Sequence, residues 1–350
     1  MKIMSKLFGE KMHNEFKDPS LYRRNIAFLS AISMISGIIC CLIGELMLPL
    51  SIAFLSALFS FEKKNRIMSW ISSAVLIIVS LAISIGYGVA TLYGFEIIIP
   101  SIVISFYFRN KRSKTEAAFI STSLIFVFTV LSLFFAGAYE AGSISFSAVS
   151  EYYKTLFEGL RQSAVDAFTS ITVPSSEGVQ EALISEEMAS SLFDQLLNML
   201  LSFLVIISFA ICGFSMKIFT SVTAKYSDKP EEIFKWRFTA TSVVAYFYVA
   251  LTVTSLFASS TASIFSVTVA NLYNIFLAVF AYLGFNFTFY LLSHRRSVAF
   301  AWILLVGAIL FLGPFTVEIL SFVGVFYSVV INKFSSGTGI GDDRHDSQDQ

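Results

Sequence analysis

The chain has 350 residues, of which 56% are hydrophobic and 14% are charged, and its mean hydropathy is +0.75. Soluble domains carry charge on about a quarter of their residues, so this composition excludes an ordinary water-soluble protein. The formal net charge is zero, with 24 basic and 24 acidic residues. We expect the lipid bilayer, and no nucleic acid, as a partner.

Long apolar runs alternate with short polar segments along the chain, which is typical of a multi-pass membrane protein. Lipid offers backbone amides no hydrogen-bond partner, so spanning segments must be helices or closed barrels. The apolar runs are continuous and do not alternate with polar residues, which favours helices. The predicted fold class is all-α, a polytopic transmembrane helical bundle in the cell membrane.

The basic residues predict the orientation of the bundle. All but two of the 24 lysines and arginines fall in six short polar segments, at residues 2–24, 63–66, 109–114, 217–237, 295–296 and 333–344. The exceptions are Lys154 and Arg161, and half of the acidic residues lie on or near the opposite side. By the positive-inside rule the six segments, and with them both termini, are predicted to be cytoplasmic.

The first apolar run follows a polar cytoplasmic segment, residues 1–25, and no small-residue cleavage pattern follows that run, so we expect a true span and no cleaved signal peptide. Ala27 and Ala31 are four residues apart in this run, which gives a small-residue face for helix packing or for docking a partner. Cys40, Cys41 and Cys212 lie within predicted helices, so we interpret them as small buried side chains without a disulfide or metal role.

Ten apolar stretches are candidate spans, at residues 26–46, 48–61, 67–92, 96–108, 116–138, 192–215, 238–258, 263–292, 297–313 and 315–332. Two of them, 48–61 and 96–108, are shorter than the roughly 17 to 25 residues of a full crossing. These two are predicted to be thin or tilted spans, or re-entrant segments. The estimate is therefore about eight long helices plus two short ones, in a transmembrane domain over residues 26–333.

An approximate duplication occupies the first hundred residues. Glu45 precedes Pro49 by three apolar residues, and Glu96 precedes Pro100 in the same way, so the pattern repeats after 51 positions. Each copy closes a long apolar run and is followed by a short apolar segment and a basic cluster, which predicts two helical hairpins. Transporter folds often contain weak internal repeats whose interrupted helices line the ligand site. Chance similarity between apolar sequences is the alternative.

One sizeable insert, residues 139–190, lies on the predicted extracytoplasmic side. Apolar residues recur there at helical intervals and predict an amphipathic helix over about residues 145–170; these are Val149, Tyr153, Leu156, Leu160, Ala164 and Phe168. Val173 to Gly178 break this helix, and a second amphipathic turn begins near residue 180. The insert either covers the bundle as a lid or gates a ligand.

A capping box at Asp228 to Glu231 predicts a cytoplasmic helix start, and the glycine-rich tail, residues 334–350, is predicted to be disordered.

No catalytic signature is present in the sequence. The three histidines, His13, His294 and His345, lie in polar segments or at a helix end. There is no zinc-protease motif, P-loop or nucleophile elbow. We therefore expect no enzymatic activity, no catalytic residues, no metal site and no cofactor.

Three glutamates are the first candidate binding residues. Glu45, Glu96 and Glu318 each lie near glycine and proline, at the predicted extracytoplasmic end of a span. Carboxylates within a membrane are costly and usually face a polar interior. They either form the mouth of an outward-facing cavity that binds a cation or the amine of a substrate, or they are hydrated turn residues at headgroup level.

Two asparagines on the predicted helix 263–292 form the second candidate locus. Asn271 and Asn274 are three residues apart and therefore share one helix face. Their amides either bind a ligand or hold a neighbouring helix by hydrogen bonds worth about 1 kcal/mol.

Four segments of the C-terminal third form a recognisable pattern: Asn271 to Asn274, Ala281 to Gly284, the basic break His294 to Arg296, and the final helix from Gly313 and Pro314 to Asn332 and Lys333. In these segments the chain resembles the YybS-like family of predicted bacterial membrane proteins of unknown function. That family is in turn similar to the substrate-binding membrane subunits of energy-coupling-factor vitamin transporters. The resemblance implies a small-molecule ligand and a coupling subunit or ATPase partner that docks at Ala27 and Ala31. Those subunits have fewer helices and little extracytoplasmic insert, so vitamin transport does not follow directly.

The sequence therefore favours a transporter-like subunit that binds or transports a small molecule and has no ATPase of its own. The alternative is a membrane scaffold or regulator that docks partners through the 139–190 insert or the basic cytoplasmic face.

Overall fold

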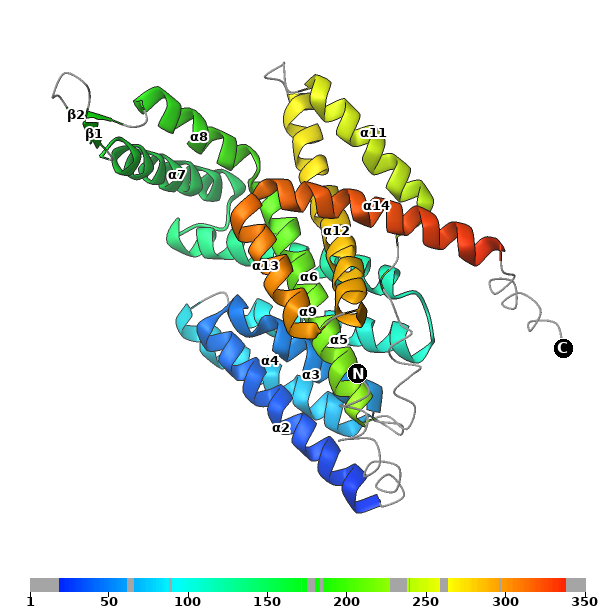
Figure 1. Ribbon diagram of the computed structural model, residues 1–350. Helices are drawn as coiled ribbons and strands as arrows, with labels where there is room; N and C mark the ends of the chain where they lie inside the picture. Colours follow the sequence, from blue (N-terminus) through cyan, green and yellow to red (C-terminus); the bar gives the residue numbers. More distant parts are fainter. Residues whose placement is uncertain are drawn as a thin grey trace. The chain divides into compact units, whose positions relative to one another are not determined.

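The computed structural model describes residues 19–61, 66–87, 90–170, 172–174, 180–182, 185–226, 238, 240–258, 264–295 and 297–337. The chain forms two compact units (Figure 1). The first unit is residues 1–197 with 207–237, and the second unit is residues 198–206 with 238–350. The capping box at 228–231 and most of the predicted terminal segments lie outside the described residues.

The first unit is built around two consecutive helical hairpins. Its helices and the 3-10 turn between the first two are α2 (Pro19–Ile43), η2 (Glu45–Met47), α3 (Leu48–Phe61), α4 (Ile67–Tyr87), α5 (Ala90–Arg109) and α6 (Lys114–Glu140). Helix α2 packs against α3, α4 packs against α5, and α3 packs against α5. The first hairpin agrees with the predicted pair of a long and a short helix, whereas α4 and α5 of the second hairpin have 21 and 20 residues.

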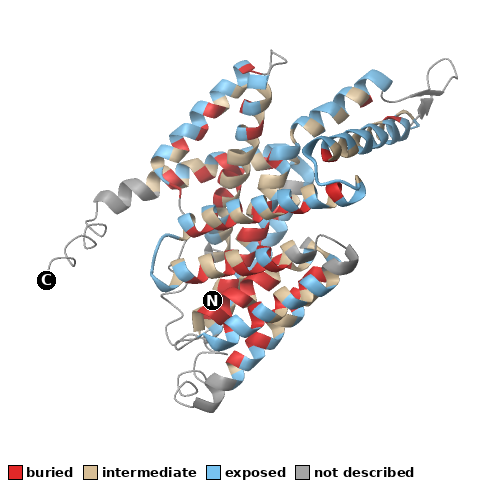
Figure 2. Ribbon diagram, turned by 180° about the vertical axis from the view of Figure 1, so that it is seen from behind, coloured by how far each residue is buried: buried red, intermediate tan, exposed pale blue. Residues whose placement is uncertain are grey.

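Helix α3 is the most deeply buried element of the first unit. It has 14 residues, so it is only about 21 Å long, less than the roughly 30 Å of a hydrocarbon core. Leu48, Ile52, Leu55 and Leu58 are fully buried against its neighbours, and buried residues are dense in this bundle (Figure 2). Its bounds match the short segment predicted at 48–61.

The second short segment differs from the sequence prediction. Residues 96–108 belong to a longer helix, because α4 ends at Tyr87 and α5 begins at Ala90. Gly94 and Pro100 therefore lie inside α5 and do not close the preceding helix. Membrane helices tolerate such residues where neighbouring helices and serine or threonine side chains satisfy the freed backbone groups. The Ser101 hydroxyl next to Pro100 donates to the Ile97 carbonyl at 2.6 Å and lies 3.1 Å from the Ile52 carbonyl of α3.

The insert consists of α7 (Phe146–Thr169), β1 (Thr172–Pro174), β2 (Gln180–Ala182) and α8 (Glu186–Asn198). Helix α7 confirms the predicted amphipathic helix, and Ser145 caps it by accepting a bond from the Ala148 amide at 3.2 Å. The strands form an antiparallel pair with Val173 opposite Glu181. This strand pair was not predicted and lies where the sequence indicated only a helix break.

Helix α7 is attached to the end of α6. The Tyr153 hydroxyl donates to the carbonyl of Leu133 at 2.6 Å, and a Cβ at Gly137 would overlap the Tyr153 ring. Arg161 of α7 contacts Ser190 and, at 3.4 Å, Asp194 of α8. The two amphipathic helices are therefore joined by these two contacts of Arg161, and the strand pair lies between them in the chain.

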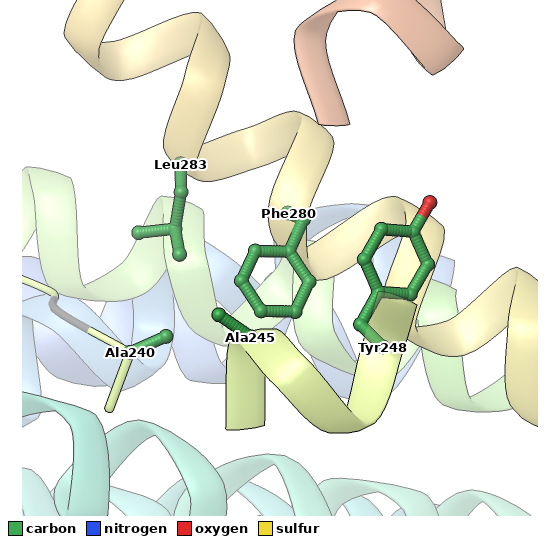
Figure 3. Close-up of a cluster of buried hydrophobic side chains, with 5 residues drawn as sticks. All are labelled: Ala240, Ala245, Tyr248, Phe280 and Leu283. Carbon is green, nitrogen blue, oxygen red and sulfur yellow. The ribbon is translucent and has the colours of Figure 1, made fainter. Parts of the chain in front are cut away.

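The second unit contains the first residues of α9 (Leu200–Tyr226) and four further helices. These are α11 (Ser242–Ala258), α12 (Ile264–Arg295), α13 (Val298–Leu312) and α14 (Pro314–Gly337). One core cluster lies between α11 and α12, where the Tyr248 ring stacks on Phe280 with centroids 4.9 Å apart. Figure 3 shows these two rings with Leu283, Ala240 and Ala245.

Helices α12 and α14 cross at backbone contact. A Cβ at Gly284 would overlap the carbonyl oxygen of Leu320, and a Cβ at Gly324 would overlap that of Phe280. Small residues allow membrane helices to approach this closely, so the two glycines are required by the crossing and not by a turn.

Among the described residues, five helices are long and apolar enough to cross a membrane by length and composition. Five more apolar helices are shorter. Among the described residues, each of the ten predicted apolar segments is mainly helical, but the numbers of long and short helices differ from the predicted eight and two.

Candidate functional site

The most distinctive polar group in the first unit is the carboxylate of Glu96. Glu96 lies nearly two turns inside α5 and has no exposed surface. The Thr129 hydroxyl of α6 donates to Glu96 Oε1 at 3.2 Å. The sequence placed Glu96 at the end of a span, and the structure corrects this position because α5 begins at Ala90.

Neighbouring small and polar residues surround the same turn of α5. A Cβ at Gly94 would lie 2.7 Å from the Ser80 hydroxyl of α4, so the glycine allows the two helices to approach closely. Pro100 carries no amide hydrogen, so the carbonyl of Glu96 receives no helical bond from position 100. Pro100 therefore removes one backbone hydrogen bond from α5 close to the buried carboxylate, and the helix continues to Arg109.

Ser132 adds an unused hydrogen-bonding group on α6. It lies one turn from Thr129, so the two side chains share a helix face. Ser132 is 5% exposed, and its hydroxyl has no hydrogen-bond partner among the described residues. A buried polar atom of this kind is uncommon and calls for a physical explanation.

The energetic cost of a charged Glu96 is substantial. Placing an acidic side chain at the centre of a membrane helix costs about 3 kcal/mol or more. One hydrogen bond to a charged group returns about 1.5 to 3 kcal/mol. The Thr129 hydroxyl supplies one such bond to Glu96. The burial of this carboxylate therefore has to be offset by the groups around it.

The other two glutamates belong to different elements, η2 and α14. Glu45 lies in η2, directly after Gly44, whose φ of +89° turns the chain from α2 into α3. The side chain of Glu45 is outside what the structure describes, so its pairing with Glu96 stays a prediction. Glu318 is exposed on α14 in the second unit.

Asn271 is buried, and its side-chain amide forms hydrogen bonds with backbone groups at the break between two helices. Its Oδ1 accepts from the Ser202 amide at 3.0 Å, and its Nδ2 lies 2.8 Å from the Asn198 carbonyl and 2.9 Å from the Val267 carbonyl. Helix α8 ends at Asn198 and α9 begins at Leu200, so the predicted span 192–215 is divided here. Asn271 therefore satisfies backbone groups that this break leaves without helical partners.

Asn274 is only half-buried and forms no comparable set of bonds among the described contacts. The two predicted asparagines consequently differ: the amide of Asn271 is occupied by the α8–α9 junction, whereas that of Asn274 is not.

Ala27 and Ala31 lie on the exposed face of α2. The small residues that pack within the unit lie on another face of this helix: the Ser30 hydroxyl is 2.8 Å from that of Ser72, and Gly37 contacts Leu76. The predicted docking face is therefore not used inside the first unit.

Sequence reasoning did not identify Thr129, Ser132 or the Tyr248–Ser321 contact. The Tyr248 and Ser321 hydroxyls are 3.0 Å apart and join α11 to α14. Isolated hydroxyls in apolar runs are common in membrane helices, so no signal distinguished these residues.

Among the described residues, no group of three or more histidine, cysteine or acidic side chains is placed to hold a metal ion.

These features define a multi-pass helical membrane protein with a carboxylate buried between its helices. The family model described as "Predicted membrane protein (DUF2232)" matches residues 26–326. The chain therefore belongs to this family. No curated protein and no solved structure matches the chain.

Proposed function

We propose that this protein is a transport or small-molecule-binding membrane subunit that holds a cationic group at Glu96. The observation that carries this proposal is the fully buried position of the Glu96 carboxylate within an apolar helix. Ionisable residues inside membrane segments are costly, and they commonly mark substrate, ion or proton pathways.

The surroundings of Glu96 support a ligand site over a purely structural bond. Gly94 and Pro100 lie in the same helix as Glu96, and a proline removes one backbone hydrogen bond from the helix beside the carboxylate. The Ser132 hydroxyl supplies a second buried polar group one turn from Thr129. An ammonium group or a metal cation would pair with the carboxylate, and the hydroxyls would complete its coordination.

Energy for transport would come from outside this chain. The sequence has no ATP-binding motif, so ATP-driven transport needs a partner ATPase or coupling subunit. The exposed Ala27 and Ala31 face of α2 is suited to close packing of a partner helix. A cation gradient is the other source of energy that a buried carboxylate can use.

The test is native mass spectrometry of the full chain gently extracted from its own membrane. The wild type is expected to retain a small cationic molecule or ion, and Glu96→Gln is expected to lose it, because the amide has the same size without the charge. The matched control is Glu116→Gln, which removes an exposed carboxylate from the first turn of α6. A ligand retained equally by Glu96→Gln, or a wild type that carries none, would contradict the proposal.

A second candidate function is a membrane scaffold or regulator. It is favoured by the apolar side chains that α7 and α8 leave exposed, including Phe146, Leu160, Met188 and Leu196. Deleting residues 145–170 is then expected to remove a co-purifying protein while the rest of the chain still inserts. An unchanged set of co-purifying proteins after this deletion would refute the scaffold function.

A further inference from the structure

Two turns at one end of the first unit carry arginines close together. Arg66 directly precedes α4, and Arg109 is the last residue of α5. The Arg109 Nη1 donates to the carbonyl of Phe59 in the last turn of α3 at 3.3 Å. Helices α4 and α5 follow one another and pack together, so Arg66 before α4 and Arg109 at the end of α5 lie at the same end of the hairpin. Both are exposed at the surface of the unit.

The described residues do not neutralise this pair of charges. The two ion pairs that they form both belong to Arg161, which lies in the insert. Lys111 and Arg112 add further positive charge in the turn after α5, and the acid that follows them is the exposed Glu116 of α6. Like charges in proximity repel unless an anion lies between them.

The basic turns have an unusual backbone. Arg66 has φ of 47° and Lys111 has φ of 52°, and these are the non-glycine residues with positive φ among those described. The turn after α5 is held by two bonds, from the Lys111 amide to Phe108 and from the Arg112 amide to Tyr107. Left-handed conformations are unfavourable for such residues and persist where the surroundings enforce them. The backbone at Arg66 and at Lys111 is therefore held in an uncommon conformation.

The surface beside these arginines is apolar. Ile67, Met68, Trp70 and Ile71 of α4 are all exposed directly after Arg66. Trp70 contacts Phe59 edge to face at 5.6 Å. The guanidinium of Arg112 lies 5.4 Å from the centre of the Phe106 ring, which is also exposed. Aromatic and basic residues together are typical of the level where lipid headgroups meet the hydrocarbon.

We propose that Arg66, Arg109, Lys111 and Arg112, named here the basic rim, bind the phosphate of an anionic phospholipid such as phosphatidylglycerol. A lipid is favoured over a free phosphate ion because the apolar side chains of α4 beside Arg66 can contact the acyl chains of the lipid. Inorganic phosphate has no apolar part that could contact these side chains. Basic groups at the ends of membrane helices are a known kind of site for anionic headgroups. This site is independent of the proposed role of Glu96.

The test titrates dioleoylphosphatidylglycerol into the delipidated full chain in detergent and counts bound lipid by native mass spectrometry. The variant Arg66→Gln with Arg109→Gln is expected to bind about 30-fold more weakly, since each basic group near an anionic lipid contributes about a factor of five. The variant Arg66→Lys with Arg109→Lys keeps the charges and is expected to retain most of the affinity. The matched control is Lys217→Gln with Lys225→Gln, which removes two exposed charges from α9.

Three results would overturn the proposal. The first is equal binding of dioleoylphosphatidylcholine, which has no net charge. The second is an equal loss of affinity in the α9 control pair. The third is displacement of the lipid by millimolar inorganic phosphate, which would assign the rim to a soluble anion. Weaker lipid binding as sodium chloride is raised is expected, because salt screens exposed charges.

Discussion

Replacing Gly284 by alanine tests the crossing of α12 and α14. The new Cβ would occupy the position of the Leu320 carbonyl oxygen, and the Gly324 amide nitrogen also lies within contact distance. Backbone atoms cannot rotate away as a side chain can, so the helices must separate. Overpacking a core costs about 1 to 3 kcal/mol, and we expect Gly284→Ala at the upper end of that range. For a unit of this size such a loss lowers the melting temperature by about 5 to 10 °C.

The assay is thermal unfolding of the full chain in detergent, followed by circular dichroism. The matched control is Gly307→Ala on α13, where a Cβ meets nothing within 4 Å. That control is expected to be neutral or to stabilise the helix by up to about 1 kcal/mol. Gly324→Ala should resemble Gly284→Ala, and the double variant should cost less than the sum, because one separation relieves both overlaps. Equal melting temperatures for Gly284→Ala and Gly307→Ala would refute the close crossing.

Three further predictions concern single side chains. Asn271→Ala should lower the free energy of unfolding by about 2 to 4 kcal/mol, measured by chemical unfolding. The reason is that the variant leaves backbone groups at the break between α8 and α9 without hydrogen-bond partners. The control Asn274→Ala should change the free energy of unfolding little. Lys111→Gly should stabilise by about 1 kcal/mol in the same assay, since glycine adopts its positive φ without strain; a destabilised variant would contradict this. Burial raises the pKa of Tyr153 above 10.0, and Tyr152 adds a smaller effect in the same direction. The contact of α7 with α6 should therefore persist below pH 10 and weaken as the pH rises through that raised pKa. Amide hydrogen exchange of α7 measures this weakening, and Tyr153→Phe should remove its pH dependence.

Only part of the candidate site could be predicted from the sequence. Glu96 was identifiable because a carboxylate in an apolar run is conspicuous and because it repeats the pattern around Glu45. The burial of Glu96 was not predictable, because the sequence placed the start of a span at residue 96, whereas α5 begins at Ala90. Thr129 lies 33 residues further along the chain, and nothing in the local pattern of α6 indicates which neighbour it meets.

Sequence patterns alone predicted the helical membrane architecture, the short helix α3 and the amphipathic α7. These properties depend on hydropathy and periodicity within short windows, which the chain carries without reference to its neighbours. Only the tertiary structure decided that Glu96 is enclosed, that Asn271 holds the α8–α9 break, and that Ala27 and Ala31 face outward. The physical reason is that membrane helices are apolar on every side, so their sequences carry little information about which face meets another helix. That choice is made by close packing and by hydrogen bonds between residues far apart in the chain.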